Sequence, residues 1–393
     1  MSKTHRQGFF FLLGIFLLGA CMRMPITSIP SIINEIAKTI GTNASNLGIL
    51  TTLPLICFGL ISIIVPLISQ RLGNEITIAI ALLILFIGSY LRIINIPTLF
   101  IGTIMVGMGI TFINVLLPAI VTELAPNKIG MMTSIYTFSL ALFSSIGAGF
   151  SAPLAKATNW QFAIQVLSFL ILTTFILWLP NLRTAKINAK KTTNVEKINP
   201  WCNQSAWLIA IYFGLSSLVF YTLVAWLPTI AIESGISETH ASLLAGLFQL
   251  VSIIPPFIVP TLAVKMTNRS PVIIISAATT ILGVVALLFS INSISYFIVI
   301  NALLGIATST TFTLTMTLFG LKTKTTTQTA KLSGMVQAIG YLLAAIGPIL
   351  TGTLKNITGS WYVSEIFIIL VIIIFMMAGI LAEKNKFIFN SNN

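Results

Sequence analysis

Charged residues are scarce in this sequence. They make up 7% of its 393 residues, and hydrophobic residues make up 56%. A soluble globular domain has about 25% charged residues. A water-soluble fold cannot hide so much apolar surface, so this composition excludes one. The balance of residue types predicts a protein that lies in a lipid bilayer.

Residues that carry metal, redox or catalytic chemistry are also few. The three cysteines, Cys21, Cys57 and Cys202, are widely separated and form no CxxC or Cys/His cluster. His5 and His240 fall in a tail and a loop, outside any Ser/His or His/Asp/Glu grouping. No GxxxxGK[ST] loop is present, so the chain has no P-loop with which to use ATP. We therefore expect free thiols, no metal, no cofactor and no enzymatic activity.

The N-terminus has two interpretations. Lys3 and Arg6 precede an apolar run that ends at Cys21, as in a lipoprotein signal with its modified cysteine. However, Arg23 and Pro25 follow at once and the apolar pattern then resumes. A first transmembrane helix is the simpler interpretation.

Apolar runs long enough to cross a membrane recur along the whole chain. A helix needs about 20 mostly apolar residues to span a bilayer core, and its hydrogen bonds are then satisfied internally. The sequence predicts an all-α membrane protein with twelve such helices. They are expected near 8–30, 46–69, 76–95, 98–122, 131–155, 160–180, 205–231, 241–264, 271–291, 294–320, 332–355 and 360–382.

Basic residues are unevenly distributed between the two sets of loops. Most of the 21 lysines and arginines lie in the two termini and in the 70–75, 123–130, 181–204, 265–270 and 321–331 loops. The opposite side has Lys38, Arg92, Lys156 and Lys355, and Arg23 lies inside a span. Short cytoplasmic loops hold the basic excess, so both termini are predicted to be cytoplasmic. The net charge of +13 therefore indicates membrane topology and no nucleic-acid partner.

The two halves of the chain repeat each other. The polar stretch 181–204 falls near the midpoint and predicts a linker between an N-terminal half, 1–180, and a C-terminal half, 205–393. Parallel repeats of six helices are typical of transporters whose halves rock around a central site. Three matched segments support the repeat: Ser145-Ile146-Gly147 with Ala345-Ile346-Gly347, Met24-Pro25-Ile26-Thr27 with Leu227-Pro228-Thr229, and Val65-Pro66 with Val259-Pro260.

Two helices carry a family resemblance. The first contains Arg23-Met24-Pro25-Ile26-Thr27-Ser28, and the seventh contains Phe220-Tyr221 followed by Ala225-Trp226-Leu227-Pro228-Thr229. These runs resemble the cyanate/nitroimidazole transporter group of the major facilitator superfamily. Met24 stands where that group usually has proline. The loop after the second helix keeps Arg71 and Gly73 but has Gln70 in place of an aspartate, which affects how this loop would latch during gating.

The resemblance implies a carrier of a small, compact solute in a bacterial plasma membrane. Its solutes would be cyanate-like anions in one branch and nitroimidazoles in another. It also implies alternating access, with the two six-helix halves rocking about a cavity, and we expect the chain to act as a monomer. Energy coupling stays open between facilitated exchange and proton-linked transport, because Glu123 and Glu365 lie at the ends of spans.

Arg23 is the leading candidate for solute binding. A charged side chain inside a membrane helix is costly and usually faces a cavity or a partner. Its planar guanidinium suits a small oxyanion or carboxylate, and Thr27 lies on the same helix face four residues on. Two alternatives are a structural pair with Glu35 or Glu365 and snorkelling to the headgroups.

Other polar residues within spans are further candidates. We predict solute contacts for Tyr221, Gln249, Asn114 and Trp226. The alternative is helix packing for Gln249 and Asn114, a place in the interfacial aromatic belt for Tyr221, and either the belt or packing for Trp226. Hinge or gating roles are predicted for a second set, whose alternatives are helix ends and close packing. This set is Pro25, Pro228, Arg71, Gly73, Gly147 and Gly347.

Two transport functions compete. In the first, Arg23 holds a compact anion such as cyanate. In the second, the protein exports nitroimidazoles or other small drugs through a mainly apolar, aromatic pocket. Arg23 separates them, since it would be essential for an anion carrier and replaceable for an exporter of neutral compounds.

Overall fold

The computed structural model of the chain describes residues 3–41, 47, 49–182, 199–289, 291–384 and 387–388. Most of the predicted linker, 181–204, therefore lies outside the described residues. All regular elements in the described ranges are helices. The chain divides into two compact units, each described by itself below. The N-terminal unit comprises Met1–Lys128, Ile135–Ile198 and Thr325–Gly334, and the C-terminal unit comprises Ile129–Ser134, Asn199–Lys324 and Met335–Asn393.

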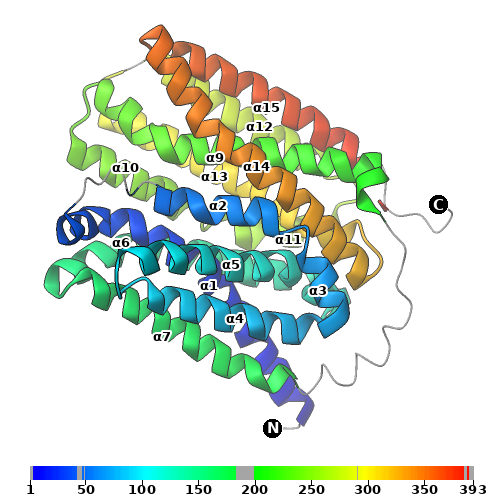
Figure 1. Cartoon of the computed structure of the whole chain (residues 1–393). Coiled ribbons are helices and arrows are strands. Elements are labelled where there is room, and N and C mark those ends of the chain that lie inside the picture. The colour runs from blue at the N-terminus through cyan, green and yellow to red at the C-terminus, as the bar shows by residue number, and fades with distance from the viewer. Residues whose placement is uncertain are drawn as a thin grey trace. The chain divides into compact units, whose positions relative to one another are not determined.

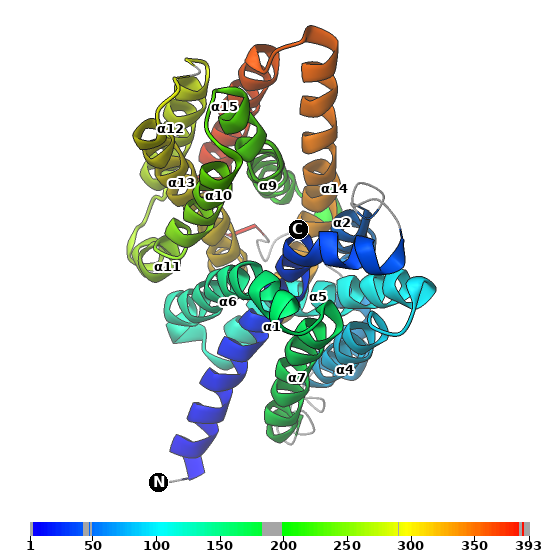
Figure 2. The ribbon, with the colours of Figure 1, turned by 90° about the vertical axis from the view of Figure 1, so that its left-hand side faces the viewer.

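In the N-terminal unit, α4 packs against both α5 and α7, and α1 packs against α5 and α7 (Figure 1). The short helix α2 covers α5. Figure 2 shows α4 and α7 side by side. The helices are α1 (Lys3–Ile40), α2 (Ile49–Ile61), α3 (Val65–Leu72), α4 (Asn74–Leu91), α5 (Ile96–Leu124), α6 (Ile129–Ala157, of which the start belongs to the other unit) and α7 (Trp160–Trp178).

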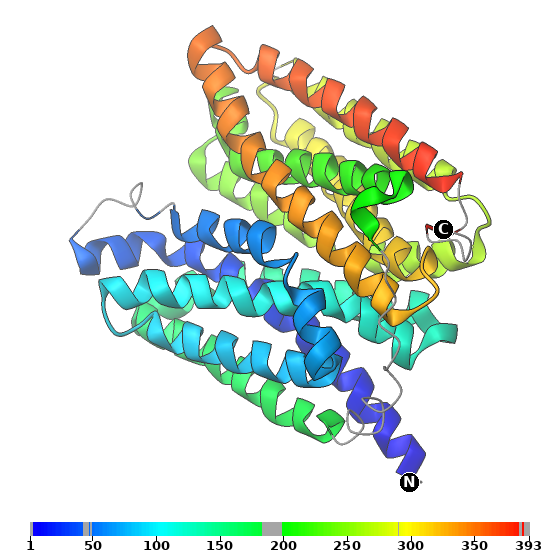
Figure 3. The same ribbon diagram turned by 45° about the vertical axis from the view of Figure 1, so that its right-hand side comes forward.

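In the C-terminal unit, α9 packs against α15, α10 and α13, and α12 packs against α13 and α15. Figure 3 shows α15, in red, running alongside its neighbours. The helices are α9 (Gln204–Glu233), α10 (Glu238–Val251), α11 (Pro255–Lys265), α12 (Ser270–Leu287), α13 (Ile294–Leu321), α14 (Thr326–Thr358, whose first turns belong to the N-terminal unit) and α15 (Tyr362–Glu383).

The prediction of twelve membrane spans is confirmed. Within the described ranges, eleven helical stretches are long and apolar enough to cross a bilayer, and the bent pair α2–α3 supplies a twelfth. The side chains on the outside of these helices are apolar, as a lipid-facing surface requires. On α4, for example, exposed side chains recur every three or four residues at Ile76, Ile80, Leu83 and Ile87.

The second span is broken, and the break has a local cause. Helix α2 ends at Ile61, and α3 starts at Val65 with Pro66 in its first turn, at an angle of 61°. Proline lacks an amide N–H and suits the first turn of a helix better than its interior. The matched Pro260 behaves differently, because it lies inside α11, which begins at Pro255. The sequence match of Pro66 with Pro260 therefore does not extend to the position of the helix break.

In each unit, a tryptophan at an equivalent position of the repeat joins two helices at one end by a side-chain hydrogen bond. In the N-terminal unit, Trp160 Nε1 at the start of α7 donates to Thr39 Oγ1 at the end of α1, 3.1 Å away. In the C-terminal unit, Trp361 Nε1 at the start of α15 donates to Glu233 Oε2 at the end of α9, 2.9 Å away. The two halves thus repeat a side-chain contact as well as a helix order.

Candidate functional site

Helix α1 carries three candidate site residues, Arg23, Pro25 and Thr27, on two of its faces. Pro25 is buried with Met22, Ile29 and other apolar residues spaced three or four apart, so this face lies against the rest of the N-terminal unit. Arg23 and Thr27 share a different face and are half-buried. The cysteine of the lipoprotein alternative, Cys21, is buried inside the same unbroken helix, where its Sγ lies 3.3 Å from Thr174 Oγ1. The region is therefore part of a transmembrane helix.

Thr27 lies at the contact of α1 with α6. Its hydroxyl lies 3.1 Å from the Ser144 carbonyl oxygen and 3.2 Å from that of Arg23, and donates to them. A Cβ at Gly147 would lie 3.0 Å from both Thr27 Oγ1 and the Met24 carbonyl oxygen. Glycine thus permits this close approach. Solute contact by Thr27 and gating by Gly147 stay predictions, and the observed role of both residues is helix packing.

Arg92 is a buried residue that sequence reasoning missed. The sequence predicts it on the side opposite the basic loops, and the structure places it directly after α4 with 1% of its surface exposed. Its Nη1 donates to the carbonyl oxygen of Pro25 at 2.8 Å. Its Nε and Nη2 atoms are buried and have no hydrogen-bond partner in the described part of the chain. The available signal was a single arginine at the outer end of a span, which cannot reveal where the side chain points.

Glycines set the path of the Arg92 side chain. Helices α4 and α5 meet at Gly88 and Gly102, where any Cβ would collide with the facing backbone. A Cβ at Gly102 would also lie 3.1 Å from Arg92 Cγ. The absence of a side chain at position 102 therefore lets the Arg92 stem lie flat against α5 and reach α1.

The remaining candidates of the N-terminal unit lie on other elements. Asn114 is buried on α5, with 6% of its surface exposed. Gly73 joins α3 to α4 with a φ of 86°, a conformation that favours glycine, and its N–H donates to the Ser69 carbonyl oxygen at 2.8 Å. Arg71 is exposed at the end of α3. Solute contact for Asn114 and gating for the loop remain predictions.

In the C-terminal unit, Trp226 is held by helix contacts. Its indole N–H donates to the Pro348 carbonyl oxygen at 2.9 Å, and its ring lies 5.2 Å from the ring of Trp361. A Cβ at Gly352 would lie 2.6 Å from the Trp226 ring. The indole donor is thus already used, and the contacts match the packing alternative.

The other candidates in this unit are spread over three helices. A Cβ at Gly347 of α14 would lie 2.5 Å from Thr222 Oγ1 on α9, a close helix contact like that of Gly147. Pro228 is half-buried within the unbroken helix α9. Tyr221 is also half-buried, with its ring 5.2 Å from that of Phe220. Gln249 is half-buried on α10.

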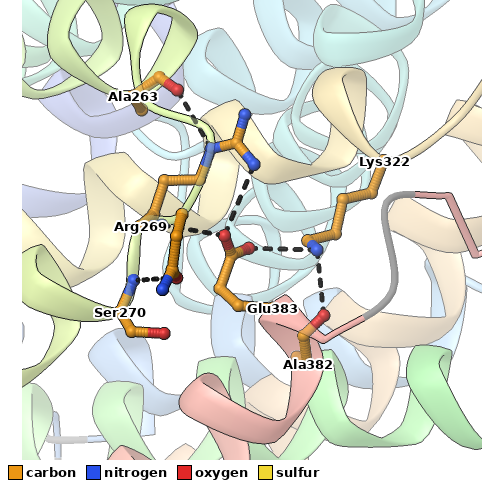
Figure 4. Close-up of polar contacts among 7 residues, drawn as sticks. Ala263, Arg269, Ser270, Lys322, Ala382 and Glu383 are labelled. Carbon is orange, nitrogen blue, oxygen red and sulfur yellow. Dashed lines mark hydrogen bonds and ion pairs between the residues drawn. The ribbon is translucent and has the colours of Figure 1, made fainter.

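A buried ionic cluster joins the ends of three helices of the C-terminal unit (Figure 4). Glu383, at the end of α15, lies 3.0 Å from Lys322 Nζ and 3.4 Å from Arg269 Nη1. The Arg269 amide also donates to Glu383 at 3.0 Å, and Lys322 Nζ donates to the Ala382 carbonyl oxygen at 2.9 Å. Burial lowers the pKa of Lys322, and the Glu383 carboxylate opposes that shift. The cluster fastens the α11–α12 turn to the ends of α13 and α15.

No group of three potential metal ligands occurs among the described residues. Around this segment of α1 lie the half-buried Arg23 and Thr27 on one face and the buried Arg92 guanidinium at the Pro25 carbonyl oxygen. A guanidinium presents several N–H donors in one plane, which can bind an anion and hold it in orientation. This set therefore suits recognition of a compact anion.

Sequence comparison identifies full-length relatives. The chain is 34% identical over 388 residues to the uncharacterised transporter YycB of Bacillus subtilis, covering 98% of this chain and 96% of that protein. It is 31% identical to the 2-nitroimidazole transporter of Escherichia coli, covering 98% of each chain. It is 22% identical to the cyanate transport protein CynX of Escherichia coli, covering 91% of this chain and 92% of that protein.

Structure and profile comparisons agree with these relatives. The fold matches the proton:xylose symporter XylE with a TM-score of 0.75 at 14% identity, covering 96% of this chain and 94% of that one. The family profile described as Major Facilitator Superfamily matches residues 11–271 and 209–386. These matches cover most of the chain and agree with its twelve apolar spans. The protein is a member of the major facilitator superfamily, with the twelve-helix fold of its transporters.

Proposed function

We propose that this transporter carries a small, compact anion, such as cyanate, across the bacterial plasma membrane by alternating access, and that Arg23 holds the anion. The observation that carries the proposal is a half-buried arginine inside a membrane-spanning stretch, one turn from Thr27 on the same face. An ionisable residue at such a depth is costly, and it normally serves a transport pathway.

Two further observations support this proposal. Close packing at Gly147 holds the Thr27 face of α1 against α6, so the orientation of the segment is fixed by backbone contacts. In addition, a second buried cation, Arg92, contacts the same segment at Pro25. Binding residues fixed by packing recognise small solutes better than residues on mobile loops.

A second candidate function is export of nitroimidazole-like compounds. The observation in its favour is the 31% identity, over 98% of each chain, to a 2-nitroimidazole transporter. Tyr221 and Gln249 would then provide a stacking face and an amide for a flat ring. Arg23 would be replaceable in that function.

Orientation and coupling form part of the same proposal. From the excess of basic residues, we also propose that both termini and the ionic cluster of Glu383 lie in the cytoplasm. Coupling is either facilitated exchange or proton-linked transport. For the latter, Glu365 is a candidate proton carrier, because it is 3% exposed at the start of α15.

Uptake into proteoliposomes tests the proposed function. Purified wild type, Arg23→Ala and Arg23→Lys would be compared for a panel of compact anions and azoles, with and without a pH gradient. Lys38→Ala is the matched control, since Lys38 is an exposed cation near the end of the same helix. We expect saturable anion uptake that Arg23→Ala abolishes and Lys38→Ala preserves. If azoles are transported equally by all variants and anions by none, the exporter function replaces the anion carrier.

A further inference from the structure

Arg92 is a buried cation of the N-terminal unit with no counter-charge among the residues that the structure describes. It is 1% exposed, and only its Nη1 has a hydrogen-bond partner, the Pro25 carbonyl oxygen, among the described residues. An arginine keeps its proton in proteins, so this site is positively charged at neutral pH. The ion pairs found in the described ranges join Arg269 and Lys322 to Glu383, and Lys355 to Glu233, and none of them involves Arg92.

The charge is not needed to satisfy a helix carbonyl. In the C-terminal unit, the neutral indole of Trp226 donates to the Pro348 carbonyl oxygen at 2.9 Å. The bond from Arg92 to the Pro25 carbonyl oxygen has nearly the same length. A buried cation costs far more than a neutral donor, because it is removed from water without a counter-charge. A structural contact alone therefore does not account for a guanidinium at this position.

Arg92 lies close to the proposed anion-binding residue but on another side of α1. Pro25 follows Arg23 by two residues, which is a rise of about 3 Å and a rotation of about 200° around the helix axis. The Arg92 guanidinium therefore contacts α1 nearly opposite to the direction in which Arg23 points. Across a helix about 10 Å wide, an anion held by Arg23 would be on the order of 10 Å from this second charge.

We propose that Arg92 is a specificity-determining residue for transport. Its unpaired charge, on the side of α1 away from Arg23, raises the affinity for anions over that for neutral solutes. The proposal rests on the proposed function, since it requires that an anion binds near Arg23. Packing of the Arg92 stem on Gly102 and the bond to Pro25 hold the charge in place. At an effective dielectric constant of about 20, a unit charge at about 10 Å changes anion affinity roughly tenfold.

The test separates charge from structure by comparing two solutes. KM for cyanate and for N-methylated 2-nitroimidazole, which has no N–H to ionise, would be measured in proteoliposomes at equal pH on both sides. Arg92→Gln removes the charge and keeps a donor for the Pro25 carbonyl oxygen, whereas Arg92→Lys keeps the charge. We expect Arg92→Gln to raise the anion KM about tenfold and to leave the azole KM within twofold. Arg92→Lys should stay within about threefold of wild type for both solutes.

Two results would overturn the inference. One is an unchanged anion KM in Arg92→Gln, and the other is an equal rise in KM for both solutes, which indicates a structural role only. Lys38→Gln, which removes an exposed cation of α1, is the control for general surface charge. Should Arg92→Gln fail to fold, Arg92→His provides the same comparison within one protein, because its charge is lost between about pH 5 and 8. Its ratio of anion KM to azole KM should then rise with pH relative to wild type.

Failure of the inference can be told apart from failure of the proposed function. Wild type that transports the azole and no anion refutes the proposed function, and the role of Arg92 falls with it. Wild type that transports the anion with an Arg23-dependent KM, but shows no effect of Arg92→Gln, refutes the inference alone.

Discussion

Glu383→Gln should strongly destabilise the C-terminal unit. Glu383 and Lys322 have side chains that are 2% and 1% exposed, and Arg269 is 16% exposed. Removing the carboxylate charge leaves two cations facing each other with little solvent. Breaking a buried ion pair by loss of one partner costs about 3–5 kcal/mol. Glutamine can still accept from the Arg269 amide, so we expect a loss of about 3 kcal/mol.

Thermal unfolding in detergent measures this loss. On the scale of soluble domains, about 3 kcal/mol lowers the melting temperature by roughly 6–12 °C. A thiol-reactive fluorophore is a suitable probe, because Cys21 and Cys57 are buried and react only on unfolding. The exposed Cys202 would be replaced by serine in every protein that is compared.

Two further variants make the measurement decisive. Lys355→Gln is the matched control, since it breaks the 2.8 Å ion pair between Lys355 and Glu233. The side chain of Lys355 is 26% exposed and that of Glu233 is 42% exposed. Exposed pairs contribute at most about 1 kcal/mol, so its melting temperature should change little. Adding Lys322→Met to Glu383→Gln removes one unpaired cation and should recover part of the loss. A Glu383→Gln protein that melts within 1–2 °C of wild type would refute the reasoning.

Two other predictions concern helix contacts. Gly147→Val and Gly347→Val should each impair transport and lower stability by about 1–3 kcal/mol, because the added atoms collide with α1 and α9 respectively. Gly149→Val is the control, since a Cβ there meets nothing within 4 Å, and it should match wild type in both transport and thermal unfolding. Trp226→Phe removes the hydrogen bond to the Pro348 carbonyl oxygen, so the free energy of unfolding should fall by about 1 kcal/mol while KM stays at the wild-type value. A raised KM with unchanged stability would instead place Trp226 in the solute pathway.

The spans and the repeat could be predicted from sequence because their causes are local or periodic. A bilayer acts as a uniform apolar solvent, so a run of about 20 apolar residues is sufficient to identify a crossing helix. The paired segments around Gly147 and Gly347 were visible for a related reason. Each half must pack its own helices closely, and small residues recur where backbones approach.

Other features needed the three-dimensional arrangement. The break between α2 and α3 lies just before Pro66, whereas the matched Pro260 lies inside the intact helix α11, so identical residues occur in different local structures. The partner of the Trp226 indole, the Pro348 carbonyl oxygen, lies 122 residues away and could not be read from the sequence. Such partners depend on which helices become neighbours.

The sequence by itself determined that this is a twelve-helix membrane carrier, and it singled out Arg23 as a charge inside a span. Only the tertiary structure revealed the hydrogen bond from Arg92 to the carbonyl oxygen of Pro25, 67 residues away. The same holds for the ionic cluster of Glu383 with Lys322 and Arg269. Hydropathy places a residue along the membrane normal, because the bilayer acts on each segment separately. It does not determine which side chain faces which, because that depends on long-range packing of helices whose apolar surfaces are chemically alike.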